Sequence, residues 1–455
     1  MRGTTSRIAE FATATTFDAL PDELVEEAKY LVLDHAGCAI AGASVAKGAI
    51  ALAFARQMGG PPEATILGQA GKVSSVNAAF ANGELMNALD WDAIPHTLPC
   101  VIAPCLALAE SRRPSGRELI LSMQIGFEIA TRLAQVLPGD LEPQPHGYGS
   151  CVLGAVAGAG RLLGLDREQM EHALGIAGFA APVPAMTRFE GGASPIAMTK
   201  YISIGWVAQT AVTCALLASL GYTGDRAILD GPEGFWRLFG GTPERWDAEK
   251  LAAGLGQEWR TGRPWYKPYP CEVLIGVAIN RLKDIMRENA LAPDDIESIE
   301  FRSIPVLATP CHTTTILSSH IDAQFSVPYA LAVAAHEIEP GPAWQDEKTM
   351  RAPAIGRFMS RVRVGVHTGE VDAKQASSVG HIPLHLEVLA KGRRLSIDRV
   401  ETFMTREQLV VKFEGNAAMR LPARTVNTAR RLILGLDTLG DVSQMTASLA
   451  PGGES

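Results

Sequence analysis

The spacing of apolar residues changes twice along this chain of 455 residues, and this limits the possible folds more than any other feature. Up to Trp265 apolar residues recur every three to four positions, as in amphipathic helices. Beyond Trp265 short segments alternate with period two, as in half-buried strands, and the C-terminal residues return to the helical period. We therefore predict a mainly α fold: a large helical domain of residues 1–265, completed by residues 404–455, and an inserted α+β domain of residues 266–403.

The same periodicities predict the individual elements. Helices are expected over 22–36, 77–89, 104–111, 116–137, 152–163, 167–179, 206–220, 272–287, 323–335 and 426–436. Strands are expected over 299–304, 362–366, 384–388 and 395–402, with Lys391-Gly392 as the turn of a hairpin. The many Ala and Gly residues of the helical segments indicate close contacts between helices.

Composition excludes several classes of protein. With 47% hydrophobic and 20% charged residues, the chain is too apolar and too weakly charged to be mainly disordered. The net charge is −8 and no run of Lys or Arg exceeds a doublet, which argues against binding to nucleic acid or an anionic membrane. The apolar windows 101–109 and 206–220 are interrupted and too short to span a membrane, and no signal peptide is recognisable. Seven scattered cysteines without C-x-x-C pairs indicate free thiols, and we expect a cytoplasmic protein.

Familiar cofactor and metal motifs are missing or poorly placed. The glycine-rich segment 158–164 is one residue too long for a dinucleotide fingerprint and lies within a helical pattern, so we interpret its glycines as helix-packing positions. His381 and His385 are four residues apart, but Pro383 between them argues against a helical metal pair. We therefore expect no metal and no cofactor.

Four short segments carry ionisable residues next to apolar helices. They are 87–97 with Asp90, Asp92 and His96, 144–150 with His146, 198–201 with Lys200, and 265–271 with Lys267. Each has an ordinary alternative: a helix cap for Asp90, loop positions for the histidines and surface positions for the lysines. Together they supply groups for binding an anionic substrate and for proton transfer, and small-ligand sites concentrate between domains.

The chain also resembles the MmgE/PrpD family in motifs that keep their order over nearly its whole length. The matching segments are Asn82-Gly83, A-L-D-W-D at 88–92 with His96, 104–110, 146–165, H-A-L-G-I-A-G at 172–178, 199–232, K-P-Y-P-C at 267–271 and D-A-Q-F-S-V-P-Y at 322–329. This family includes 2-methylcitrate dehydratase, cis-aconitate decarboxylase and iminodisuccinate epimerase.

The resemblance implies a helical domain with a smaller α+β lid, an active site between them without a metal or iron–sulfur cluster, and commonly a homodimer. It places the family's active-site residues on Asp90, His96, His146, Lys200 and Lys267. We expect both lysines to bind substrate, together with three residues that flank these positions: Thr97, Tyr148 and Tyr269.

Several residues depart from the family pattern. The segment after Asp90 is short, and Thr97-Leu98 stands where the family has Pro-Ser. Ile94 occupies the place of a threonine expected in the decarboxylase, Glu272 stands where Arg or His follows K-P-Y-P-C, and Gly147-Tyr148 replaces Pro-Thr. We expect the general chemistry to persist and leave the substrate open.

The chemistry implied by the resemblance is proton transfer at a carbon next to a carboxylate. We expect Lys200 and Lys267 to hold substrate carboxylates and His96 or Asp90 to remove the proton, while His146 protonates a leaving hydroxyl or the opposite face. The first prediction is a lyase of the 2-methylcitrate dehydratase type that acts on a small di- or tricarboxylate. The alternatives are a cofactor-independent epimerase of a dicarboxylate and, third, a non-catalytic polycarboxylate-binding protein.

Overall fold

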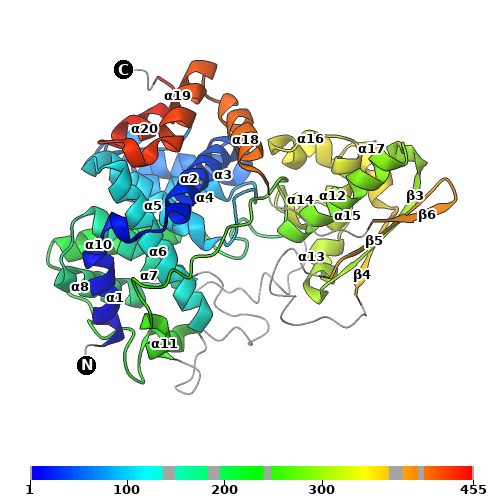
Figure 1. Ribbon diagram of the computed structural model, residues 1–455. Coiled ribbons are helices and arrows are strands. Elements are labelled where there is room, and N and C mark those ends of the chain that lie inside the picture. The colour runs from blue at the N-terminus through cyan, green and yellow to red at the C-terminus, as the bar shows by residue number, and fades with distance from the viewer. Residues whose placement is uncertain are drawn as a thin grey trace.

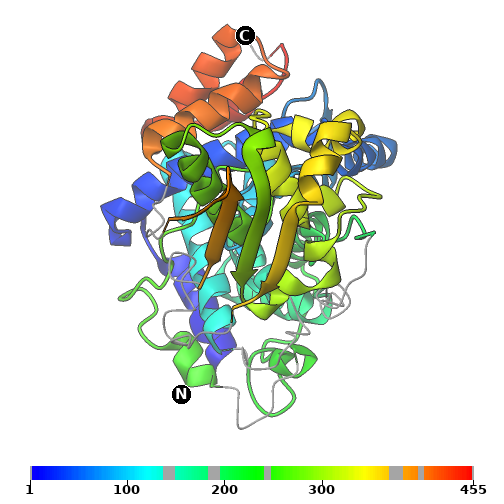
Figure 2. The ribbon, with the colours of Figure 1, turned by 90° about the vertical axis from the view of Figure 1, so that its right-hand side faces the viewer.

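The computed structural model describes residues 3–136, 149–182, 195–239, 247–367, 383–397 and 404–452. Figure 1 shows two parts: a large group of helices that contains both ends of the chain, and a smaller part in which helices pack on a sheet. Figure 2 shows the open face of that sheet, with its helices behind it. The predicted fold class, mainly helical with a smaller α+β part, is confirmed.

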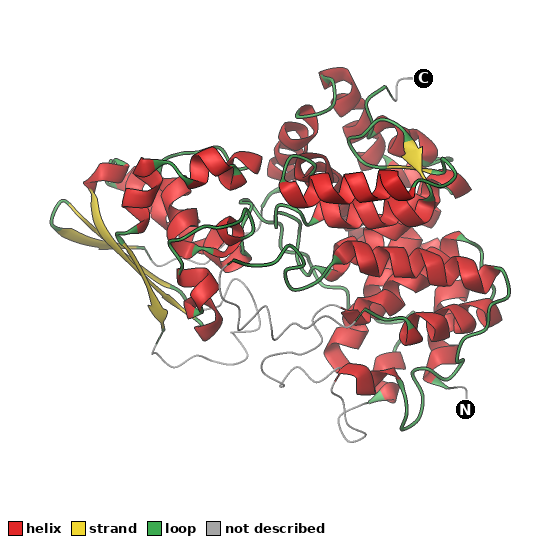
Figure 3. Cartoon of the chain, turned by 180° about the vertical axis from the view of Figure 1, so that it is seen from behind, coloured by secondary structure: helices red, strands yellow, loops and turns green. Residues whose placement is uncertain are grey.

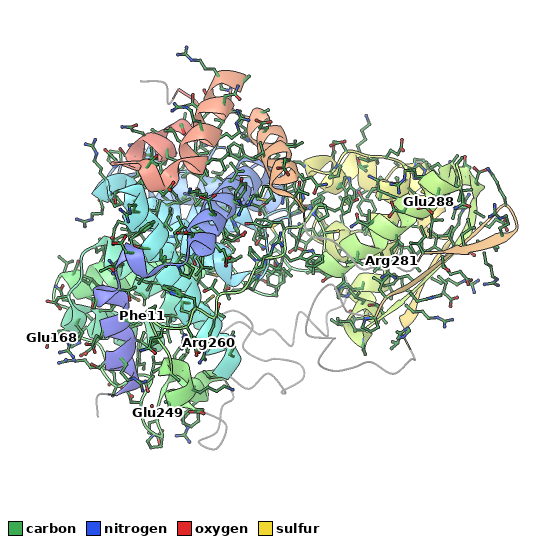
Figure 4. All side chains as sticks on the ribbon, in the orientation of Figure 1. Phe11, Glu168, Glu249, Arg260, Arg281 and Glu288 are labelled. Atoms are coloured by element: carbon green, nitrogen blue, oxygen red, sulfur yellow. The ribbon has the colours of Figure 1, made fainter. Side chains whose placement is uncertain are left out.

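The larger hydrophobic core is shared by helices from both ends of the sequence. Phe413 of α18 (Arg406–Ala418) is fully buried in this core, where α18 packs against α2 (Asp22–Gly42). Phe11, labelled in Figure 4, packs against Trp259 with the ring centroids 5.7 Å apart. The other helices of this part are α1 (Thr4–Ala14), α3 (Ala46–Met58), α4 (Ser75–Met86), α5 (Thr97–Arg112), α6 (Gly116–Val136), α7 (Val152–Leu162), α8 (Arg167–Phe179), α10 (Ile204–Ser219), α11 (Ala248–Ala252), α19 (Ala423–Leu434) and α20 (Ser443–Ser448).

Glycines let α6 and α7 approach closely. A Cβ atom at Gly154 would lie 2.3 Å from the carbonyl oxygen of Gly126, and one at Gly158 would lie 2.8 Å from that of Ser122. Carbon and oxygen atoms do not approach so closely, so a larger residue would push the helices apart. The interpretation of Gly158 as a helix-packing position is confirmed.

Two details of the helical part differ from the sequence prediction. A two-stranded antiparallel sheet, β1 (Ala64–Thr65) and β2 (Lys72–Val73), interrupts the region that was expected to be all helical (Figure 3). In addition, α5 begins at Thr97 rather than Pro104 and runs through the proline. Every residue from Thr97 to Glu110 is buried, so packing outweighs a local cost of about 3 kcal/mol for proline inside a helix.

The smaller core lies between one face of a four-stranded sheet and its helices. The strand order is β4-β3-β5-β6, with β3 and β4 parallel and the other pairs antiparallel. Alternate residues of β5 are buried, as the period of two predicted, and Lys391 and Gly392 have φ of 50° and 69°, which a two-residue hairpin turn requires. The elements are α12 (Val273–Glu288), β3 (Ile296–Ser303), α13 (Pro310–Thr313), α14 (Asp322–Phe325), α15 (Val327–Ala335), α16 (Glu347–Met350), α17 (Pro353–Met359), β4 (Val362–Val366), β5 (His385–Ala390) and β6 (Arg393–Ser396).

The helix predicted over 323–335 is two helices, α14 and α15. Ser326 caps α15 by accepting a hydrogen bond from the backbone N–H of Tyr329 at 3.2 Å, and Pro328 has no N–H with which to continue α14. Ile321 and Phe325 are buried in the larger core rather than the smaller one. The two parts therefore meet at α14, while the domain boundaries at 265/266 and 403/404 stay predictions.

Among the described helices none is by itself long and apolar enough to cross a membrane. Only α2 and α3 together reach the required length and apolarity, and they form a pair bent by 91°.

Candidate active site

The loop between α4 and α5 carries three ionisable side chains into the protein interior. Asp90, Asp92 and His96 are 1%, 0% and 7% exposed. Asp90 has a φ of 55°, in the left-handed region that non-glycine residues rarely adopt. Lys200, which contacts Asp90, has a φ of 49°. Backbone strain of this kind persists only where surrounding contacts hold it, and it clusters at functional sites.

Asp90 is held by two lysines and a tyrosine. Its Oδ2 lies 2.8 Å from Nζ of Lys267, and its Oδ1 accepts hydrogen bonds from the Tyr201 hydroxyl at 2.7 Å and from Lys200 Nζ at 3.4 Å. Burial disfavours the carboxylate, but the charges of Lys267 and Lys200 outweigh burial and hold the pKa of Asp90 well below its usual range. Asp90 is therefore ionised at neutral pH and is a weak proton acceptor.

Lys267 reaches Asp90 from the segment that joins the two parts. Trp265 and Ile94 form an isolated antiparallel bridge with two N–H···O bonds of 3.0 Å, which holds this segment beside the Asp90 loop. The ammonium of Lys267 also donates to the backbone carbonyl of Asp90 at 3.0 Å. Burial lowers the pKa of Lys267, but the charges of Asp90 and Asp92 raise it by more than burial lowers it, so that the net shift is upward. Lys267 is thus a permanent cation.

Lys200 can lose its proton much more readily than an ordinary lysine. Its side chain is fully buried, and its Nζ donates to the carbonyl of Asn87 at 2.7 Å in addition to Asp90. Burial lowers the pKa of Lys200 to about 7; Asp90 opposes this shift and the charge of Lys47 adds to it. Lys200 therefore exchanges its proton near neutral pH.

Asp92 and His96 form an oriented pair next to Asp90. Oδ2 of Asp92 accepts a hydrogen bond from Nδ1 of His96 at 2.8 Å, and Nε2 of the same ring lies 3.9 Å from Oδ1 of Asp90. The ring of His96 stacks on Tyr201 with a centroid distance of 4.8 Å. Burial raises the pKa of Asp92, but the charge and hydrogen bond of His96 lower it more, so that Asp92 is ionised. A carboxylate on Nδ1 leaves Nε2 as the nitrogen for proton transfer, as in other carboxylate–histidine pairs.

A buried lysine of α18, Lys412, forms hydrogen bonds with the loop that carries Asp90 and with the segment that carries Lys267. Nζ of Lys412 lies 2.7 Å from Oδ1 of Asp34 and donates to the carbonyls of Trp91 at 2.6 Å and Lys267 at 3.0 Å. The second carboxylate oxygen of Asp34 accepts the N–H of Ala93 at 3.0 Å. Sequence reasoning missed Lys412 and Asp34, because both lie in ordinary helical patterns and no local signal marks them.

Two glutamines of the α+β part hold the same loop from the other side. Gln324 donates to the carbonyl of Ala88 at 2.8 Å, and Gln345 donates to that of Leu89 at 2.9 Å. The two side chains also bond to each other, Gln324 Nε2 to Gln345 Oε1, at 2.8 Å. Gln324 lies in the D-A-Q-F-S-V-P-Y motif, so the sequence could have indicated it as a site residue. Nothing in the sequence marked Gln345.

Glu272, which departs from the family pattern, lies close to these charges. Its Oε2 caps α12 by accepting the N–H groups of Leu274 at 2.8 Å and Ile275 at 3.1 Å. Burial raises the pKa of Glu272 to about 7, although the charge of Lys267 opposes the shift.

The structure brings together Asp90, His96, Lys200 and Lys267 of the predicted site. Thr97 is buried at the start of α5, directly after His96. Tyr269 does not join this group: its ring stacks on Trp344 in the smaller core, and its hydroxyl donates to Asn280 at 3.0 Å. Tyr269 stands two residues after Lys267, and its side chain packs into the α+β part. The contacts of Tyr269 therefore do not support its expected contact with substrate. His146 and Tyr148 lie outside the described residues.

The cluster combines fixed cations with a group for proton transfer. Lys200 and Lys267 suit an anion, and His96 with Asp92 suits a proton moved at a carbon atom. Within the described part of the chain, no three His, Cys, Asp or Glu side chains are grouped as a metal ion would need.

Comparisons with known proteins cover nearly the whole chain. Residues 6–246 match the MmgE/PrpD N-terminal domain, and residues 269–438 match the MmgE/PrpD C-terminal domain. The chain is 27% identical to a cis-aconitate decarboxylase of Aspergillus terreus, over 97% of this chain and 95% of the relative. It is 26% identical to the cis-aconitate decarboxylase of Homo sapiens, over 94% of this chain and 91% of the relative.

Proposed function

The chain belongs to the MmgE/PrpD family of enzymes that act on carboxylates, and on that premise we propose that it is a lyase for a small tricarboxylate of the cis-aconitate type. One observation carries the proposal: a buried carboxylate, Asp90, is held between Lys200 and Lys267 beside a histidine that Asp92 orients. Cations fixed before the substrate arrives favour a reaction in which negative charge grows on a bound carboxylate.

We place decarboxylation of cis-aconitate first, because relatives that align over most of both chains carry that name. In this reaction the bond from carbon to one carboxylate breaks and carbon dioxide leaves. The electron pair moves through the neighbouring double bond, and a proton is added to carbon. Lys200 and Lys267 hold the remaining carboxylates while the charge is delocalised.

His96 is the residue we assign to the proton transfer at carbon. The sequence left His96 and Asp90 as alternatives, and the geometry favours His96 because its Nδ1 is bonded to Asp92 while its Nε2 faces Asp90. Asp90 has a pKa far below its usual range, which makes it a poor acid or base near neutral pH. Its role is to position and partly neutralise the two lysines.

Dehydration, the first prediction from the sequence, is the second candidate. It would use the same groups to remove a proton next to a carboxylate, with a second group protonating the leaving hydroxyl. The observation in its favour is Ile94, which stands where the decarboxylase has a threonine. The same departure keeps epimerisation among the reactions to be tested.

Incubation of the purified protein with cis-aconitate, 2-methylcitrate and iminodisuccinate in D₂O, followed by NMR, separates these reactions. Decarboxylation of cis-aconitate gives carbon dioxide and a dicarboxylate that carries one deuterium. Dehydration gives a new alkene signal, and epimerisation gives deuterium uptake without net loss of substrate. If none of the three binds or reacts, the proposed function is wrong. The homodimer and the cytoplasmic location stay predictions from the sequence.

A further inference from the structure

Two buried nitrogen atoms near Lys200 lack hydrogen-bond partners among the described residues. One is Nζ of Lys47 on α3, which lies 3.1 Å from Oε2 of Glu84 but makes no hydrogen bond of acceptable geometry. The other is Nε2 of His320, in the turn before α14. The two residues are only 4% and 8% exposed. A buried polar group without a partner costs about 1–3 kcal/mol, so each of these nitrogens needs an explanation.

Lys47 is linked through Glu84 to the residues that follow Lys200. The carboxylate of Glu84, its ion-pair partner, accepts hydrogen bonds from the Ser203 hydroxyl at 2.5 Å and from the N–H of Gly205 at 2.8 Å. Glu84 is thus already satisfied by the chain just after Lys200. It neutralises Lys47 without using all three N–H donors of the ammonium group.

The turn that carries His320 forms hydrogen bonds with Ile196, which precedes Lys200. The neighbouring Ser319 hydroxyl donates to the carbonyl of Ile196 at 3.5 Å, and the N–H of Ile196 donates to Oδ1 of Asp322 at 2.9 Å. The turn that carries His320 therefore packs against the helical part four residues before Lys200.

The charges of these groups also influence one another's pKa. Burial lowers the pKa of His320 to about 4, and the charges of Lys200 and Lys47 lower it as well. Lys47 in turn lowers the pKa of Lys200. The three groups come from α3, from the turn before α10 and from the α+β part, and each of the two lysines influences the imidazole.

We propose that Lys47 and His320 form a second anion subsite beside Lys200, which binds the far carboxylate of a tricarboxylate whose reacting end lies at Asp90 and His96. The inference rests on the proposed function and adds to it where the rest of the substrate binds. A carboxylate accepts from an ammonium and from an imidazole N–H at the same time, and this would give both nitrogens a hydrogen-bond acceptor. Because His320 belongs to the α+β part and Lys47 to the helical part, such a ligand bridges the two.

The test compares a tricarboxylate with a dicarboxylate on the full chain. Calorimetry measures the Kd of tricarballylate, which has three carboxylates, and of methylsuccinate, which is the same molecule without one terminal carboxylate. The wild type is expected to bind tricarballylate at least tenfold more tightly. His320→Leu and Lys47→Met should each weaken tricarballylate binding about tenfold and leave methylsuccinate binding within twofold. On any substrate that is turned over, KM should rise while kcat stays within threefold.

Control variants separate a local effect from a loss of folding. Lys47→Met leaves Glu84 without its cation, so Lys47→Met with Glu84→Gln is measured beside it, and His320→Gln, which keeps a donor, should recover part of the affinity. Lys283→Met, an exposed lysine of α12, should change neither Kd.

The outcomes also distinguish the subsite from the proposed function. If folded His320→Leu and the Lys47 variants bind tricarballylate as the wild type does, or lose both ligands equally, the subsite is wrong although the wild type still turns over carboxylates. If the wild type neither binds nor converts any carboxylate, both the subsite and the proposed function are wrong.

Discussion

Nζ of Lys267 lies 2.8 Å from Oδ2 of Asp90, although 177 positions separate the two residues. Asp90 follows α4 in the helical part, whereas Lys267 stands where the chain passes into the α+β part. Both side chains are only 2% exposed, so this ion pair forms only when both segments are packed. The charge arrangement of the candidate site is therefore tied to the contact between the two parts.

His96→Asn should lower kcat about 10²–10⁴-fold on whichever carboxylate is turned over, because it removes the proton-transfer group. Asp92→Asn should lower kcat in the same direction, because the histidine loses the carboxylate that fixes its tautomer. Steady-state kinetics measures both. His336→Asn, at the C-terminal end of α15, serves as the matched control. Near-normal kcat in His96→Asn would contradict the assignment.

The pH dependence of kcat/KM should show the ionisation of Lys200. With a pKa of about 7 in the free protein, its ammonium form is lost as the pH rises above 7, and kcat/KM should fall tenfold per pH unit. A bound carboxylate stabilises the ammonium, so the corresponding fall in kcat should lie at higher pH. Lys200→Arg keeps its charge and should flatten the profile between pH 7 and 9.

Glu272→Gln controls for Glu272, whose pKa is also about 7, and should leave this alkaline limb in place. A wild-type profile that rises through pH 7 and does not fall above it would contradict this role of the Lys200 ammonium.

Glu272 itself should make the protein less stable as the pH rises. Its pKa is about 7 when folded and about 4.3 in an unfolded chain, so the folded state binds more protons between these values. The free energy of unfolding should thus fall from pH 4.5 to pH 7 on account of this group. Glu272→Gln removes that contribution. In urea unfolding, the free energy of unfolding of Glu272→Gln relative to the wild type should therefore be higher at pH 8 than at pH 5. An equal effect at both pH values would contradict the shift.

Lys412→Met should lower the free energy of unfolding by about 3–5 kcal/mol, because it leaves the charge of Asp34 buried without a partner. It also removes the donor to the carbonyls of Trp91 and Lys267. Chemical unfolding measures the loss, and the double variant Asp34→Asn, Lys412→Met should recover part of it. If the double variant is as unstable as the sum of the single variants, the ion pair is not the cause.

Gln345→Leu should lower kcat about tenfold to a hundredfold with little change in KM, because a small displacement of the Asp90 loop disturbs the reacting geometry. It removes the bond to the carbonyl of Leu89 directly before Asp90. Gln345→Asn, which keeps an amide on a shorter side chain, should have a kcat between those of the wild type and Gln345→Leu. The exposed Gln257→Leu is the control, and a pure rise in KM would argue against a positioning role.

The helical and α+β parts were predictable because the period of apolar residues reflects local backbone geometry. Most of the predicted helices lie within a few residues of their expected ends, and the hairpin at Lys391-Gly392 was found from two residues alone. Of the two errors that follow, the first has a non-local cause and the second a local one. Pro104 is tolerated inside α5 because the surrounding core holds that helix, and the helix over 323–335 divides where Ser326 provides a cap.

For the site, the sequence by itself determined which ionisable residues are available and, through motif order, where Asp90, His96, Lys200 and Lys267 stand. Only the tertiary structure decided their ionisation: burial brings Lys200 to a pKa of about 7, and the paired lysines keep Asp90 charged. It also decided which other residues hold the Asp90 loop, since Lys412, Gln324 and Gln345 reach it from distant segments. The physical reason is that a pKa and a buried hydrogen bond depend on neighbours in space, and no local pattern of residues records them.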